Sequence, residues 1–218
     1  MIASYEQWLK TVFDHPVGAG LPEWYWGPDF DAVWDSLELD QAVTVEYLTR
    51  LFARPDVLHG YSLDQVAQAI WFLVGSSPAE PIRAVLDVSV PLGSRVGCVS
   101  TIATFFRDFV EPAAPGPSRA NDDPFHTACY MWWDLFPTWG GPASGEAEIH
   151  RACLNAMGET LRLPSELCQL SALHGLNHWH LHYGSHVEHT IDAFLAGTAD
   201  VSPMIRDYAA AARAGCAQ

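Results

Sequence analysis

The stretch that decides the fold is LCQLSALHGLNHWHLHYGSHVEHTIDAFL, which runs from Leu167 to Leu195 and holds six of the ten histidines. Apolar residues recur every three or four positions in its first half, as on one face of a helix. Ser165 precedes the run as a candidate N-cap. Tyr183-Gly184-Ser185 is a stop signal, because glycine easily adopts the left-handed conformation that ends helices, and a second apolar face restarts at His186. The stretch therefore predicts two amphipathic helices joined by a short turn, an αα-hairpin.

The histidines of this stretch suggest a metal site. On an unbroken helix, a stripe at intervals of four residues would form from His174, His178, His182 and His186. Neutral imidazoles on adjacent helical turns can bind one transition-metal ion such as zinc. In an extended segment, by contrast, His178, His180 and His182 would share one face of a strand. Neither HExxH nor a Cys-x-x-Cys pair accompanies the cluster.

Packing is the competing interpretation of the same histidines. Under it, His174 and His178 are buried and hydrogen-bonded between helices, while the later histidines lie in a solvated turn. Gly184 favours this interpretation, because it interrupts the helical stripe. Under the metal interpretation, Glu188 and Asp192 would hydrogen-bond to the ligands from outside, and His150 or His126 would contribute from a neighbouring helix.

Helical patterns continue through the rest of the chain, separated by short turns that contain proline or glycine. Cap residues and apolar periodicity predict helices over 4–13, 40–53, 63–74, 80–86, 93–109, 125–136, 146–161 and 203–213. The one apolar run that fits a strand, Val88 to Val90, is too short to found a sheet, so we expect a loop there. The pattern predicts an all-α protein.

One segment has the composition of a linker. EPAAPGPSRANDDP, from Glu111 to Pro124, is rich in proline and small polar residues and predicts a mobile surface loop. The chain has 218 residues, which is enough for one domain with a substantial core. We therefore expect a single all-α domain over residues 1–218, with the loop near its middle.

A weak internal repeat suggests that helical hairpins are stacked. LDQVA at 63–67 and LCQLS at 167–171 both open a helix after a serine, and IRAVL at 82–86 is similar to IDAFL at 191–195. Stacked units of this kind bury a continuous core and form a solenoid.

The motif SALHGLNHW at 171–179, followed by VE at 187–188 and IDAFL at 191–195, resembles a HEAT-like repeat of bacterial proteins with no assigned role. CYMWWDLFP at 129–137 is similar to another part of the same proteins. The resemblance implies a short HEAT-like α-solenoid and no catalytic residues. Several acidic HEAT-like proteins of this size are similar to immunity proteins that neutralise secreted toxins, which suggests the same role here by analogy.

The strongest global signal is charge. The formal net charge is −15, and Lys10 is the only lysine. Such a surface repels nucleic-acid phosphates and anionic membranes, so we expect neither as a partner. It attracts basic proteins and speeds their association, although acidity also serves solubility alone. The scattered cysteines and the absence of a signal-peptide pattern or a membrane-length apolar run indicate the cytoplasm.

We therefore expect a non-enzymatic protein–protein interaction module without a cofactor, whose acidic surface binds a basic protein. An immunity-type inhibitor of a basic toxin is one form of that function. The P-loop, the GxSxG elbow and the dinucleotide fingerprint are all absent from the sequence. A metal-dependent enzyme using the cluster from His174 to His189 is the alternative hypothesis, and a structural scaffold is the third.

Overall fold

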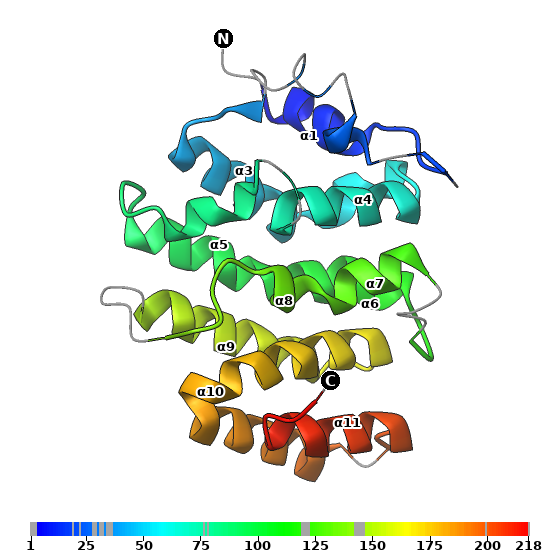
Figure 1. The fold of residues 1–218 in the computed structure, drawn as a ribbon, viewed down its shortest axis with the longest axis vertical. Helices are drawn as coiled ribbons and strands as arrows, with labels where there is room; N and C mark the ends of the chain where they lie inside the picture. The colour runs from blue at the N-terminus through cyan, green and yellow to red at the C-terminus, as the bar shows by residue number, and fades with distance from the viewer. Residues whose placement is uncertain are drawn as a thin grey trace.

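The structure is a computed structural model and describes residues 4–18, 20, 21, 23–27, 30, 33, 37–75, 77, 79–118, 123–141, 147–198 and 200–217. This described part is helical and contains no strand. The helices are stacked along the long axis of the molecule, with α1 at one end and α11 at the other (Figure 1). The elements are α1 (Tyr5–Phe13), η1 (Trp24–Trp26), α3 (Gln41–Ala53), η2 (Pro55–Gly60), α4 (Leu63–Val74), η3 (Pro81–Leu86), α5 (Leu92–Phe105), η4 (Phe106–Val110), α6 (Glu111–Ala113), α7 (Pro124–Tyr130), α8 (Trp132–Leu135), α9 (Ala147–Leu161), α10 (Glu166–Gly197) and α11 (Pro203–Arg213).

Polar side chains cap several of the helices. Ser4 and Ser62 form complete capping boxes, and the Asp40 carboxylate accepts a hydrogen bond from the second amide of α3. Ser202 caps α11 in the same way. Ser165 is different, because its hydroxyl donates to the carbonyl of Ala114 at 2.9 Å and makes no cap bond to α10. Its role is to join two segments that are distant in the sequence.

Several predicted elements differ in detail. The helix that starts at Leu92 ends in a π-helical turn, and the predicted helix over 125–136 is interrupted at Met131. Residues 81–86 form a 3-10 helix, and Val88 to Val90 lie in a loop as expected. In the predicted linker, 111–113 are helical, whereas 119–122 lie outside the described residues. No helix in the described part is long and apolar enough to cross a bilayer.

The histidine-rich stretch forms α10, which bends sharply at Tyr183 (Figure 1). Tyr183 leaves helical geometry, with φ −130° and ψ 31°, so the two predicted helices follow each other with almost no turn between them. Gly184 has no positive φ, and the glycine mechanism predicted for this break is therefore wrong. The Tyr183 ring packs closely on Gly140, where an added Cβ atom would lie 2.8 Å from it.

The short helix α8 is held between two glycines. A Cβ atom at Gly175 of α10 would lie 2.6 Å from Cβ of Trp133, and one at Gly75 after α4 would lie 2.7 Å from Cβ of Leu135. Real Cβ contacts are essentially never this short, so only glycine permits the approach. Asp134 stands between these two contact residues, and the clamp therefore fixes its position over α10.

We expect Gly175→Ala to destabilise the protein by about 1–3 kcal/mol through overpacking, although alanine has the higher helix propensity. The matched control is Gly97→Ala in α5, where an added Cβ meets nothing within 4 Å. That change should stabilise the protein by about 0.5–1 kcal/mol. Urea unfolding of both variants measures the difference, and equal effects of the two substitutions would rule out the clamp.

Candidate functional site

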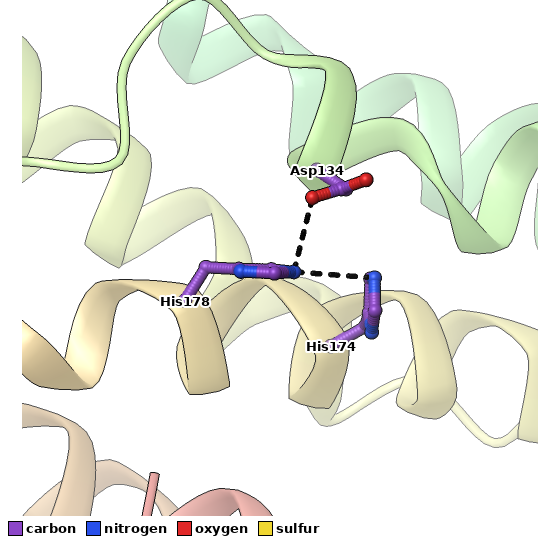
Figure 2. A group of neighbouring side chains, drawn as sticks. All are labelled: Asp134, His174 and His178. Carbon is purple, nitrogen blue, oxygen red and sulfur yellow. Dashed lines mark hydrogen bonds and ion pairs between the residues drawn. The ribbon is translucent and has the colours of Figure 1, made fainter. Parts of the chain in front are cut away.

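The candidate site is a group of three side chains from α8 and α10. His174 and His178 lie one turn apart on α10, and Asp134 of α8 points down between them (Figure 2). Nε2 of His178 is 3.1 Å from Oδ1 of Asp134 and 3.3 Å from Nε2 of His174. All three ligand atoms lie within 4.8 Å of one another. His174 is buried, whereas the side chains of His178 and Asp134 are 25% and 26% exposed.

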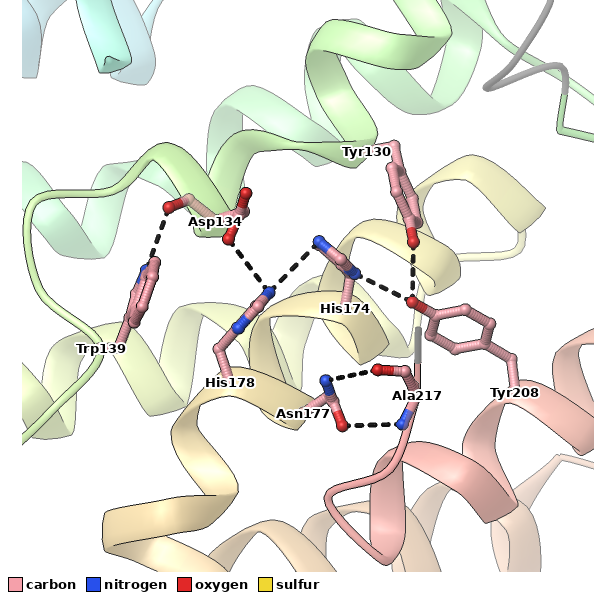
Figure 3. A network of polar contacts seen from close by, with 8 residues as sticks. All are labelled: Tyr130, Asp134, Trp139, His174, Asn177, His178, Tyr208 and Ala217. Carbon is pink, nitrogen blue, oxygen red and sulfur yellow. Dashed lines mark hydrogen bonds and ion pairs between the residues drawn. The ribbon is translucent and has the colours of Figure 1, made fainter. Parts of the chain in front are cut away.

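The outer contacts of the site hold both imidazole rings in place (Figure 3). Nδ1 of His174 is 2.9 Å from the hydroxyl of Tyr208 in α11, which is 2.8 Å from the hydroxyl of Tyr130. Trp139 stacks on His178 with a centroid distance of 5.1 Å, and its indole N–H donates to the carbonyl of Asp134. Each residue of the group is therefore fixed by a second residue from another segment.

One tautomer of His174 leaves an acceptor facing the site. When Nδ1 of His174 carries its proton toward Tyr208, its Nε2 presents a bare lone pair. Nε2 of His178 and Oδ1 of Asp134 face the same space. When His178 carries its proton on Nδ1, its Nε2 presents a lone pair as well, and a divalent cation would accept all three donor atoms at once.

Burial favours the neutral form of His174. The pKa of His174 is lowered to about 4, mainly by desolvation and also by the neighbouring His178, while the Asp134 carboxylate opposes the shift. Burial also raises the pKa of Tyr208, which keeps its hydroxyl protonated at neutral pH. A neutral imidazole is the form that coordinates a metal, so His174 is ready to act as a ligand without losing a proton.

The distances of the group are close to those of a zinc site. Zn–N and Zn–O bonds of about 2.0–2.1 Å place the ligand atoms of a tetrahedral site about 3.3–3.4 Å apart. The two separations measured from His178 are 3.1 and 3.3 Å, and the third, between Asp134 and His174, is no more than 4.8 Å, so zinc binding would draw these two side chains together. Within the described part of the chain, no fourth histidine, cysteine or carboxylate joins the group.

The structure brings together two of the four histidines predicted as ligands. His182 and His186 are exposed and stand outside the group, so the predicted stripe is only half realised. The other histidines and acids considered from the sequence lie outside the group. His180 faces Glu188 at 3.5 Å, Asp192 pairs with Arg213 at 2.7 Å, His150 bonds the Tyr183 hydroxyl at 2.8 Å, and His126 lies on α7.

Asp134 is the site residue that the sequence did not identify as a ligand. One feature of the sequence could have indicated it: Asp134 is the only charged residue in the apolar run CYMWWDLFP. A carboxylate in such a run needs a polar partner, and here that partner is His178.

Comparisons with protein-family models, with curated proteins and with solved structures found no match to this chain.

Acid should destabilise the metal-free protein through His174. Its folded pKa of about 4 lies below the roughly 6.5 of an unfolded histidine, so the unfolded state binds the proton first as the pH falls. The contribution is complete above pH ~6.5 and is lost toward pH 4, with roughly 2 kcal/mol lost by pH 5. Urea unfolding in EDTA at several pH values measures this slope.

The slope should shrink in His174→Gln and persist in His182→Ala, which removes an exposed histidine. Identical slopes in the wild type and His174→Gln would show that another group carries the acid sensitivity.

Proposed function

We propose that this protein binds one divalent transition-metal ion, such as zinc, through Asp134, His174 and His178. The observation that carries the proposal is the grouping of one carboxylate oxygen and two imidazole nitrogens, which all lie within 4.8 Å of one another. The ligand set of two imidazoles and a carboxylate suits zinc and the neighbouring divalent metals rather than Cu(I), which prefers sulfur.

The exposure of the group favours a site with an open coordination position. Structural zinc sites have four protein ligands, whereas catalytic sites keep three and leave one position for water or substrate. Here three ligands are available in the described residues, and two of them are about one-quarter exposed. Bound zinc supplies a Lewis acid and an acidified water molecule, which is the chemistry of metal-assisted hydrolysis. Metal-dependent hydrolysis is therefore the reaction class that we propose for this centre.

A second function, binding of a basic protein, is favoured by a different part of the surface. Glu23 and Asp64 line a hollow of about 350 Å³ together with Trp71 and Leu21, which is 55% exposed. No cation pairs with either carboxylate among the described residues. Two free carboxylates beside an indole fit an arginine or lysine side chain.

The HEAT-like, immunity-type assignment is a proposal of the same kind. The stacking of helices in Figure 1 and the net charge of −15 support it. A stack of helical hairpins offers an extended surface for a protein partner. A reducing cytoplasm is the compartment we propose, because Cys98, Cys129, Cys153 and Cys168 are buried free thiols.

Metal binding is tested by titrating the EDTA-treated, untagged protein with zinc in a calorimeter. We expect one equivalent to bind to the wild type. Asp134→Asn and His178→Gln each remove a ligand and should weaken binding by more than about 100-fold, beyond the typical cost of losing an outer partner.

The matched control for this titration is the double variant His182→Ala/His186→Ala, which removes the two exposed histidines outside the group. It should retain the wild-type affinity. An equal loss of zinc affinity in the control variant would place the metal on the exposed histidines. Absence of zinc binding to the wild type would refute the proposed metal site.

The basic-partner proposal predicts that Asp64→Arg weakens binding of an octa-arginine peptide, because it places a cation in the hollow. Asp207→Arg makes the same charge change on exposed α11, at the other end of the stack, and serves as control. Fluorescence anisotropy at low and at high salt measures both affinities. If the two variants bind equally, recognition reflects only the net charge.

A further inference from the structure

We propose that Tyr208 couples the metal centre to helix α11, so that metal binding and docking of α11 strengthen each other. This inference rests on the proposed metal site. Tyr208 is the residue of α11 that reaches a ligand, with its hydroxyl 2.9 Å from Nδ1 of His174 (Figure 3). It is a positioning residue, because it acts on the ion only through the imidazole.

The tautomer of His174 links metal binding to the docking of α11. A neutral imidazole that coordinates through Nε2 must carry its proton on Nδ1, so Nδ1–H donates to the Tyr208 oxygen. The Tyr208 hydroxyl then donates to Tyr130, 2.8 Å away, and every hydrogen bond in the chain points away from the ion. The opposite polarity has the ring proton on Nε2 and the Tyr208 hydroxyl donating to Nδ1, and a metal on Nε2 would exclude it.

His174 would donate a stronger hydrogen bond from Nδ1–H to Tyr208 with a metal on its Nε2, because coordination would draw electron density from the ring. The acceptor belongs to α11, whose remaining ties to α10 include the exposed pair between Arg213 and Asp192. The residues after α11 are held as well, by two hydrogen bonds of 3.0 Å between Asn177 and Ala217.

The coupling is reciprocal by thermodynamic necessity. Whatever factor the docked Tyr208 adds to metal affinity, the bound metal adds to the docking equilibrium of α11. Metal binding would therefore stabilise the docked state of α11, the last helix of the stack. Loss of the metal would loosen that helix without unfolding the rest.

Two measurements test the coupling. Hydrogen exchange of the α11 amides in the wild type should slow on addition of zinc. Tyr208→Phe keeps the ring but removes the acceptor of Nδ1–H, and it should weaken zinc binding by roughly 10–100-fold. In that variant, zinc should no longer protect α11.

The control is Arg213→Gln, which breaks the exposed pair with Asp192 and leaves His174 untouched. Its zinc affinity should stay within about twofold of the wild type.

The outcomes separate this inference from the proposed function. If zinc does not bind the wild type, both fail. If zinc binds but Tyr208→Phe retains full affinity and α11 exchange is unchanged, the metal centre stands and the coupling is overturned. The exchange measurement on the wild type decides the coupling by itself if Tyr208→Phe does not fold. An equal loss of affinity in Arg213→Gln would show that loosening α11, rather than losing this hydrogen bond, causes the effect, and would overturn the role of Tyr208.

Discussion

The site depends on the close approach of α8 to α10 at Gly175. With any larger residue there, Trp133 would move away, and the next residue, Asp134, would lose its reach to His178. A second tie supports the same approach, since the Ser171 hydroxyl donates to the carbonyl of Cys129 at 2.7 Å inside the core. A tightly packed helical interface therefore does the positioning, and the polar group is assembled at its solvent-facing edge.

Tight packing also explains why a polar group can persist in such an apolar region. Trp132, Trp133 and Trp179, which belong to the same two helices as the group, are fully buried. The chain from Tyr130 through Tyr208 to His174 supplies hydrogen-bond partners on the inner side of the group. On the outer side, two imidazole nitrogens and a carboxylate oxygen face one another at His174, His178 and Asp134. That set of metal-ligand atoms distinguishes the group from an ordinary buried hydrogen-bond network.

Local features were predictable from the sequence, and contacts between distant segments were not. Cap residues such as Ser62 and the apolar period identify the helices because both act within one or two turns. The pairing of His174 with His178 follows from their spacing, as predicted. His182 continues the same spacing but faces solvent, because α8 is only four residues long and covers about one turn of α10. His186 lies beyond the bend at Tyr183.

Asp134 could not be predicted as a ligand, because its contact with His178 joins segments that are distant in the sequence. It is forty residues before His174 in the sequence, and its contact is made by two glycines that no local pattern marks as contact points. The bend in α10 shows the complementary case. Its position at Tyr183 agreed with the sequence, but Gly184 has no positive φ, and the Tyr183 ring is in close tertiary contact with Gly140. Local signals locate such features, and tertiary packing decides their geometry.

The acidic surface bears on both proposed functions and does not discriminate between them. A net charge of −15 attracts a divalent ion and a basic protein alike, but salt screens that attraction beyond about 8 Å at physiological ionic strength. Discrimination must therefore come from short-range geometry. Convergent lone pairs at Asp134, His174 and His178 suit a small ion, whereas separate carboxylates at Glu23 and Asp64 beside Trp71 suit a cationic side chain. The two sets share no residue, and their helices α8, α10 and α4 lie in different layers of the stack, so one molecule can carry both functions.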